Sequence, residues 1–156
     1  MKKKKYIFIT FLIIIIDQLT KFLINQNINY LKSIQIIKNF FYFTNAHNNG
    51  AAFSILSGYN LLFICVTLIA IYLINKYIEK NISFYILLGG IIGNLIDRLI
   101  FGYVRDFLDF RIFNYNFPIF NISDICICLG IFLIIIKTIK EDKNDNKWRK
   151  RWKKNW

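Results

Sequence analysis

Four apolar stretches, each close to 20 residues long, dominate this chain of 156 residues. They cover residues 6–23, 59–78, 82–101 and 119–139. A helix of about 20 residues spans the hydrocarbon core of a bilayer, and it satisfies its own backbone hydrogen bonds there. The stretches therefore predict an all-α integral membrane protein, with four transmembrane helices in a single domain covering residues 1–156.

The composition excludes two other classes of protein. Apolar residues make up 56% of the chain and charged residues 19%, and the charges are bunched between the apolar stretches. A soluble domain would disperse more charge over its surface, and a disordered chain would lack this apolar content. The first stretch follows four lysines, as in a secretory signal, but no Ala-x-Ala cleavage site comes after it. We expect it to remain as an uncleaved anchor.

The positions of the basic residues predict the orientation in the membrane. Of the 21 Lys and Arg residues, four precede the first stretch and nine lie from Lys137 onward. Lys76 and Lys80 lie between the second and third stretches. Basic residues gather on the cytoplasmic side of membrane proteins. We therefore expect both termini in the cytoplasm, with residues 25–58 and 102–118 on the opposite, periplasmic side.

The first periplasmic segment contains a strand-like run, residues 34–44, in which apolar β-branched and aromatic residues dominate. The sequence Asn48-Asn49-Gly50 that follows is typical of a tight turn. A sheet edge inside lipid would leave backbone groups without partners. We therefore expect a small periplasmic β-cradle that rests on the membrane surface.

The C-terminal tail, residues 140–156, is basic and carries Trp148, Trp152 and Trp156 at four-residue intervals. On a helix these indoles would share one face, and Lys and Arg would fill the others. The pattern predicts an interfacial helix that binds anionic membrane lipids, with a solvated tail as the alternative. A charge run alone is weak evidence for nucleic-acid binding, so no nucleic-acid partner is expected.

No metal ion or cofactor is expected. His47 is the single histidine, and Cys65, Cys126 and Cys128 lie in apolar runs without a CxxC pair. We interpret the cysteines as small buried hydrophobic residues, and His47 as a surface residue.

Two carboxylates inside the predicted spans have a basic residue nearby that could neutralise their charge. An ionisable group in a spanning helix is costly, so it marks a functional site or a buried ion pair. Asp17 has Lys21 one helical turn later, on the same helix face. Asp97 adjoins Arg98, and Asn94 lies one turn before Arg98. Structural ion pairs that join helices are one interpretation of both pairs.

Three further carboxylates stand at the outer level of the spans. Asp124 lies where the fourth span begins, and Asp106 and Asp109 follow the third span by five and eight residues. Asp124 alone would suit a helix N-terminus, where the helix dipole favours an acid. Asp106 and Asp109 alone would suit a polar loop. A pair drawn from the three could nevertheless meet at the outer membrane surface.

Two facing carboxylates suit the hydrolysis of an amide. Like charges a few ångströms apart cannot both ionise at low cost, so the pair holds one proton. The ionised member takes a proton from water, and the protonated member hydrogen-bonds the scissile carbonyl. A Ser-His-Asp triad would need His47, and no GxSxG elbow is present. Nothing singles out a Ser-Lys pair such as Ser54 with Lys21.

Five short motifs stand out against the Ile- and Asn-rich composition of the chain. They are Asp17-Gln18-Leu19-Thr20-Lys21, Asn48-Asn49-Gly50-Ala51-Ala52-Phe53-Ser54, Gly93-Asn94-Leu95-Ile96-Asp97-Arg98, Val104-Arg105-Asp106-Phe107 and Phe120-Asn121-Ile122-Ser123-Asp124. With these motifs in this order, and four spans around them, almost the whole chain resembles the lipoprotein signal peptidases, also called signal peptidase II.

The resemblance implies an aspartic endopeptidase of the bacterial inner membrane. Its substrates would be diacylglyceryl-modified prolipoproteins, cut just before the lipidated cysteine. The motifs assign the catalytic pair to Asp106 and Asp124, and they give Asp109 no catalytic role. They give supporting, substrate-facing roles to seven residues: Asp17, Lys21, Asn48, Gly50, Asn94, Arg98 and Asn121.

The resemblance carries three further expectations. A small helix beside the β-cradle would lie within residues 34–58. The antibiotic globomycin would inhibit the protein by occupying the catalytic site. No span calls for an obligate partner, so a monomer is expected.

A small proton- or ion-coupled transporter is the main alternative, because intramembrane carboxylates suit transport as well. A transporter should carry charges at the midplane and a repeat of its halves. Here the acids cluster toward the outer face and no repeat is visible. A membrane chaperone or assembly subunit would need no carboxylate pair.

Overall fold

The structure is a computed structural model that describes residues 2–50, 58–112 and 115–144. The tryptophans of the tail, and Ala51, Ala52 and Ser54 of the second motif, lie outside the described residues. The elements in chain order are α1 (Lys2–Asn27), β1 (Ser33–Ile37), β2 (Phe41–Asn48), α2 (Asn60–Tyr77), α3 (Ile82–Phe101), β3 (Val104–Ile112), β4 (Tyr115–Asn116) and α4 (Ile122–Asn144).

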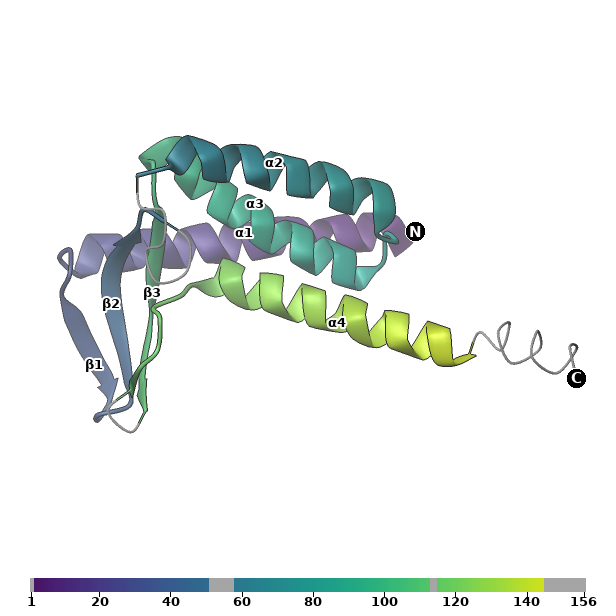
Figure 1. The fold of residues 1–156 in the computed structure, drawn as a ribbon. Coiled ribbons are helices and arrows are strands. Elements are labelled where there is room, and N and C mark those ends of the chain that lie inside the picture. Colours follow the sequence, from purple (N-terminus) through teal and green to yellow (C-terminus); the bar gives the residue numbers. More distant parts are fainter. Residues whose placement is uncertain (1, 51–57, 113–114, 145–156) are drawn as a thin grey trace, which may run out of the picture.

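The helices lie alongside one another, and the sheet projects from one end of the bundle (Figure 1). The start of α1 and the end of α4 lie at the opposite end. The end of α3 and the beginning of α4 therefore meet the strands. This junction brings together described residues of all five sequence motifs.

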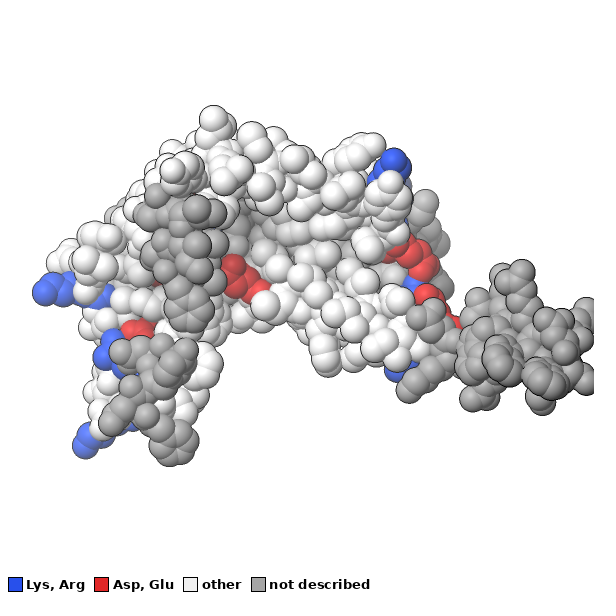
Figure 2. Space-filling model, viewed as in Figure 1, with Lys and Arg blue, Asp and Glu red and all other residues white. Residues whose placement is uncertain are grey.

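Four helices are long and apolar enough to cross a membrane, which confirms the predicted fold class. α2 buries none of its residues, and Phe8 on α1 and Leu61 on α2 are 64% and 74% exposed. In water this would be unfavourable, whereas lipid accepts such surfaces. Figure 2 shows the same property, because charged atoms lie mainly at the two ends of the molecule and the helical surface in view is almost uncharged.

Glycines bring α3 and α4 close together. A Cβ on Gly130 of α4 would lie 2.8 Å from the backbone of Leu87 on α3, and a Cβ on Gly90 would meet the backbone of Ser123. A Cβ on Gly93 would collide with Ser123 and with the carboxylate of Asp17 on α1. Small residues allow such close approach between membrane helices. α3 is consequently the best-buried helix, and it carries Asn94 and Asp97 into the interior.

The strand-like run over residues 34–44 is a hairpin rather than one strand. β1 and β2 pair antiparallel, and the chain turns between Ile37 and Phe41. Asn39 has φ 54°, a left-handed conformation that asparagine tolerates better than most residues. A continuous apolar pattern does not reveal this reversal, because the side chains on both sides of the turn are similar.

β3 occupies a segment that the sequence allowed to be a polar loop. It pairs antiparallel with β2, so that Ala46 lies opposite Asp106 and Tyr42 opposite Asp109. β4 follows it, and the strand order is β1-β2-β3-β4. Phenylalanines of the sheet pack against one another, and Phe41 is stacked on Phe110 with 4.7 Å between the ring centres. The sheet thus places the carboxylates of β3 among polar partners.

α4 begins at Ile122, three residues after the predicted start of the fourth span. The preceding residues are held in extended form, because Phe120 exchanges backbone hydrogen bonds with Leu108 of β3. Pro118 is compatible with this extended approach, since it cannot donate a backbone hydrogen bond. The first turn of α4 therefore stands directly beside β3.

Candidate active site

All nine predicted site residues belong to one continuous set of polar contacts at the junction of the sheet and the helices. Donor–acceptor distances between successive members are 2.6–3.2 Å. In order of contact, the members are Asp17, Lys21, Asn94, Asp124, Asn121, Asp106, Asn48, Gly50 and Arg98.

Asp124 is fixed by the way α4 begins. Asn121 precedes the helix, and its side-chain oxygen accepts a hydrogen bond from the backbone N–H of Asp124 at 3.0 Å. Asp124 returns the contact, because its Oδ2 accepts from the backbone N–H of Asn121 at 3.2 Å. This reciprocal arrangement is a capping box, which ties the first turn of a helix to the residue before it.

Two amide side chains join the carboxylate of Asp124 to that of Asp106. Asn121, which is fully buried, donates its Nδ2 to Asp106 Oδ1 at 2.6 Å. Asn94 donates to Asp124 Oδ1 at 2.8 Å, and its own oxygen accepts from Asn121 at 3.2 Å. The two carboxylates therefore share one hydrogen-bonded support, although 18 positions separate them in the sequence.

Asp106 lies on β3 with only 4% of its surface exposed. Burial, together with the negative charge of Asp124, raises the pKa of Asp106 from 3.8 to about 7. The hydrogen bonds from Asn121 and Asn48 oppose this rise in pKa but do not cancel it. A carboxyl group with this pKa holds or releases a proton near neutral pH, as general acid–base chemistry requires.

A buried ion-pair cluster supports the site from α1 and α3. Lys21 Nζ contacts Asp17 at 2.8 Å, as its helical spacing predicted, and it donates to Asn94 at 3.0 Å. Asp97 pairs with Arg105 at 2.7 Å and lies 3.4 Å from Lys21. All four ionised side chains are at least 90% buried, so each depends on the others for compensation.

The expected compensation of Asp97 by Arg98 is wrong. Consecutive residues of a helix point in directions about 100° apart, so the two side chains cannot face each other. Arg98 instead donates to the carbonyl oxygen of Gly50 at 3.0 Å and lies over the ring of Phe63. Gly50 also donates to the side chain of Asn48 at 3.0 Å. Arg98 thus holds the segment that leaves β2.

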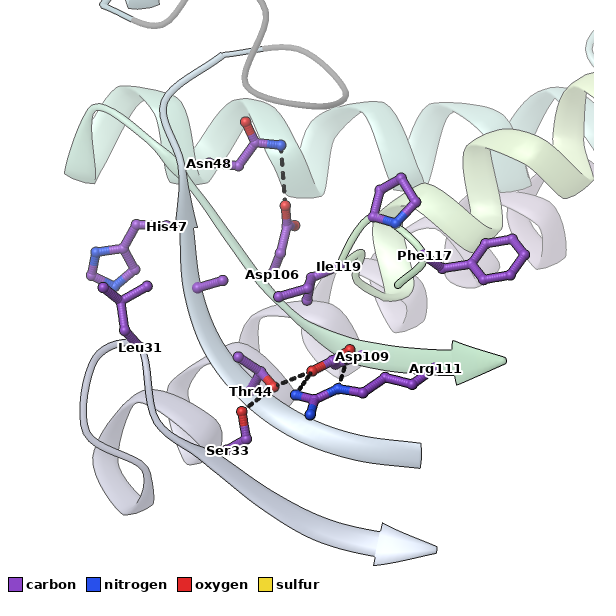
Figure 3. Close-up of a pocket in the computed structure, with 12 residues that line it drawn as sticks. Leu31, Ser33, Thr44, His47, Asn48, Asp106, Asp109, Arg111, Phe117 and Ile119 are labelled. Atoms are coloured by element: carbon purple, nitrogen blue, oxygen red, sulfur yellow. Dashed lines mark hydrogen bonds and ion pairs between the residues drawn. The ribbon is translucent and has the colours of Figure 1, made fainter. Parts of the chain in front are cut away.

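A cavity of about 560 Å³ opens beside Asp106 on the sheet (Figure 3). Asn48 on β2 points toward Asp106 and donates to its Oδ2 at 3.1 Å. Farther along β3, Asp109 and Arg111 also line this cavity. Asp109 accepts hydrogen bonds from Arg111 at 2.7 Å and from Thr44 at 2.8 Å. The structure thus gives Asp109 a cation as partner, and separates it from the amides that join Asp106 to Asp124.

His47 is not the surface residue that we expected. Its ring is stacked between Tyr30, at 4.4 Å, and Tyr103, at 4.0 Å, and it is half-buried. Burial and the charge of Arg105 lower the pKa of His47 below 6.5, so the ring is neutral at pH 7. The sequence did not reveal this stacking, because Tyr30 and Tyr103 lie far from His47 along the chain.

Sequence reasoning gave no roles to three residues that complete the site. Gln18 donates to Asp97 at 3.0 Å and accepts from Arg105 at 2.8 Å. The backbone N–H of Ser123 donates to Asp17 at 2.9 Å. The sequence could have indicated them, because each of the three lies inside one of the five motifs: Gln18, Arg105 and Ser123. Within the described part of the chain, no three His, Cys, Asp or Glu residues are grouped so that they could hold a metal ion.

Comparison with known proteins identifies the family. The family model described as signal peptidase (SPase) II matches residues 9–140. The chain belongs to the signal peptidase II family. It is 37% identical over 150 residues to the lipoprotein signal peptidase of Halalkalibacterium halodurans, and the match covers 91% of this chain and 96% of that protein.

Solved structures agree with this membership of the signal peptidase II family. A bacterial membrane enzyme determined by the in meso method at 2.3 Å resolution superposes with a TM-score of 0.83 at 37% identity, covering 91% of this chain and 92% of that one. A second such structure, at 1.9 Å resolution, gives a TM-score of 0.78 at 37% identity, covering 88% of this chain and 94% of that one. The protein is therefore a multi-pass membrane peptidase.

Proposed function

We propose that this peptidase removes the signal peptide from diacylglyceryl-modified prolipoproteins by an aspartic mechanism, cutting before the lipidated cysteine. The observation that carries the proposal is the pair of buried Asp106 and half-buried Asp124, which Asn121 joins at the end of the spanning helices. The name of the H. halodurans relative supports the substrate class. The family membership favours this function over the transporter alternative.

In this mechanism the carboxylate pair holds one proton between its two members. The ionised member takes a proton from water, and the protonated member hydrogen-bonds the scissile carbonyl. Water then adds to the carbonyl carbon, and the tetrahedral intermediate collapses as the leaving amine takes up a proton. Because the two carboxylates titrate as a unit, the proton belongs to the pair. No covalent enzyme intermediate forms.

The remaining site residues orient this pair. Asn94 and Asn121 fix the carboxylates relative to each other, and Asn48 holds the second oxygen of Asp106. The Asp17–Lys21 pair braces α1 against Asn94. Arg98 and Gly50 hold the backbone after β2 close to the position of the substrate.

The proposal includes an arrangement in the bacterial inner membrane. The chain forms one membrane domain with the spans and the two periplasmic segments as predicted, and the cytoplasm contains both termini. The catalytic pair then stands near the periplasmic face, where the lipidated cysteine of a substrate meets the membrane surface. Globomycin would bind at this pair, and the protein would act as a monomer.

Cleavage of a diacylglyceryl-modified prolipoprotein by the purified protein in detergent tests the function. The wild type is expected to cut the substrate, whereas Asp106→Asn and Asp124→Asn should each lose about 10³-fold or more in kcat/KM. Glu79→Gln is the matched control, because Glu79 is an exposed acid that pairs with Lys137 away from the site. An Asn variant with near-normal turnover and a normal unfolding temperature would refute the assignment of that aspartate.

A further inference from the structure

Two cavities lie beside the carboxylate pair, one lined by Asp106 and the other by Asp124. The cavity on the sheet, about 560 Å³, has a lining of both polar and apolar side chains. A second cavity of about 540 Å³ begins at Asp124 and follows α4. Apart from Asp124, its lining is apolar: Phe120, Ile125, Cys128, Leu129 and Phe132. A substrate held at the pair can therefore extend over an apolar surface along α4, and over a mixed surface with charged and polar groups on the sheet.

We call this cavity on the sheet the sheet groove. Its lining includes Asp106, Thr44, Asp109 and Arg111 (Figure 3). Pro118 and Ile119, from the segment before α4, also line it. Its volume lies within the range of sites that bind small ligands or short peptide segments. It lies over the strands, beyond the ends of the spanning helices.

The far end of the sheet groove is a built polar site. Arg111 donates to Asp109 at 2.7 Å, and its guanidinium lies 3.9 Å from the ring centre of Tyr42. Thr44 donates to the same carboxylate at 2.8 Å and contacts Ser33 at 2.7 Å. Asp109 and Thr44 are 4% and 6% exposed, whereas the Arg111 side chain is 39% exposed. The guanidinium is thus held in a fixed position and remains reachable from the groove.

We propose that the sheet groove binds the extended peptide that follows the cleaved bond, and that Arg111 donates a hydrogen bond to a carbonyl oxygen of this peptide. This inference rests on the proposed function. It concerns the part of the substrate that follows the cleaved bond. The signal helix and the acyl chains stay in lipid, where the apolar groove of α4 matches them. The chain after the cysteine leaves the membrane, and its polar backbone needs hydrogen-bonding partners.

The geometry sets the length of peptide that the groove recognises. Asp106 and Arg111 are five positions apart on β3, which corresponds to about 17 Å at the rise of a strand. An extended peptide has the same rise per residue. About five residues beyond the cleaved bond are therefore needed before the substrate reaches Arg111.

A series of lipidated substrates tests this prediction on the unmodified protein. The substrates share one signal peptide and diacylglyceryl-cysteine, and they end in an amide one to eight residues after that cysteine. We expect kcat/KM to rise with length up to about five residues and then to stay constant. If the shortest and longest substrates are cut equally well, the groove does not bind this segment, although the peptidase function stands.

Substitution of Arg111 then tests the far end of the groove. We expect Arg111→Gln to lower the ratio of kcat/KM for the longest substrate to that for the shortest by about tenfold, which corresponds to the loss of one hydrogen bond from a charged donor. Lys38→Ala is the control, because Lys38 is an exposed cation in the β1–β2 turn that does not line the groove.

The two readouts separate binding from a structural role of Arg111. An equal loss on short and long substrates would show that Arg111 supports the sheet rather than the peptide, and would overturn its assignment. A loss confined to long substrates in Lys38→Ala would show that charge alone is responsible, and would overturn it as well. The unfolding temperature shows whether each variant folds. If a variant does not fold, the length series on the unmodified protein tests the proposal.

Discussion

At the residue scale, the site depends on amides placed between charged groups. Asn121 caps α4 through its side-chain oxygen and, through its Nδ2, donates to Asp106. Asn94 accepts from Lys21 and donates to Asp124. Each amide carries both a donor and an acceptor, so it can join groups of different charge without adding charge to a buried site. This explains why asparagine, rather than lysine or serine, stands at both positions.

The raised pKa of Asp106 predicts how activity depends on pH. The proposed mechanism needs one proton on the carboxylate pair, and Asp106 has a pKa of about 7. As the pH rises through this value the pair loses its proton, so kcat/KM should fall by about tenfold per pH unit above it. The measurement is kcat/KM between pH 5 and pH 9 at saturating detergent. A flat profile up to pH 9 would contradict the shared proton.

The buried pair of Asp97 and Arg105 predicts a large effect on stability. In Arg105→Leu the carboxylate of Asp97 stays fully buried but loses its ion pair with Arg105. Such a loss typically costs about 3–5 kcal/mol. The double variant Asp97→Asn with Arg105→Leu removes the unpaired charge, so it should be more stable than Arg105→Leu alone. Unfolding in detergent measures both. A cost below about 1 kcal/mol for Arg105→Leu would contradict the role of this pair.

At the scale of elements, the contact between α3 and α4 determines where the proposed catalytic residues stand. α3 carries Asn94, and the first turn of α4 carries Asp124, so a shift between these helices would separate the two. Gly90 and Gly93 on α3 permit the close approach at this end. The capping box at Asn121 fixes the start of α4, and the backbone bonds of Phe120 tie it to β3.

Two glycine substitutions test this helix contact. A Cβ on Gly130 would lie 2.8 Å from the backbone of Leu87, which cannot move away without shifting a helix. Gly130→Ala should therefore destabilise the protein by about 1–3 kcal/mol. A Cβ on Gly89 would lie 3.1 Å from the Cβ of Ile13, a contact that a shift of a few tenths of an ångström relieves, so Gly89→Ala should cost less. Unfolding in detergent compares them, and the reverse order would contradict this account of the packing.

At the scale of the whole molecule, the polar parts lie at the ends of an apolar bundle. The sheet and the catalytic pair stand at one end, and the start of α1 and the end of α4 at the other (Figure 1). The basic residues near both termini predict that the latter end faces the cytoplasm. The membrane thus separates the synthesis of a prolipoprotein from the proposed site of its cleavage.

Labelling of single cysteines tests this orientation. In a variant with Cys65, Cys126 and Cys128 replaced by serine, Lys38→Cys marks the sheet and Lys80→Cys marks the turn between α2 and α3. A maleimide that does not cross membranes should label position 38 in cells with a permeable outer barrier, and position 80 only after lysis. The opposite pattern would reverse the proposed orientation.

The sequence by itself determined the membrane fold and suggested the candidate residues of the site. Apolar length alone predicts four spans, because lipid admits few other arrangements of a backbone. Carboxylates in such spans are too costly to be incidental, so Asp17 and Asp97 were visible as candidates. The choice of Asp106 over Asp109 came from the family motifs, because spacing along the chain left both at the same level.

Only the tertiary structure decided which of these groups compensate one another. Arg105 pairs with Asp97 because the chain reverses after α3, and Arg98 points elsewhere. The pairing of β3 with β2, and with it the sheet groove, joins residues about 60 positions apart, which local patterns do not encode. The partners of a buried charge are set by what packs around it, and packing is a property of the whole fold.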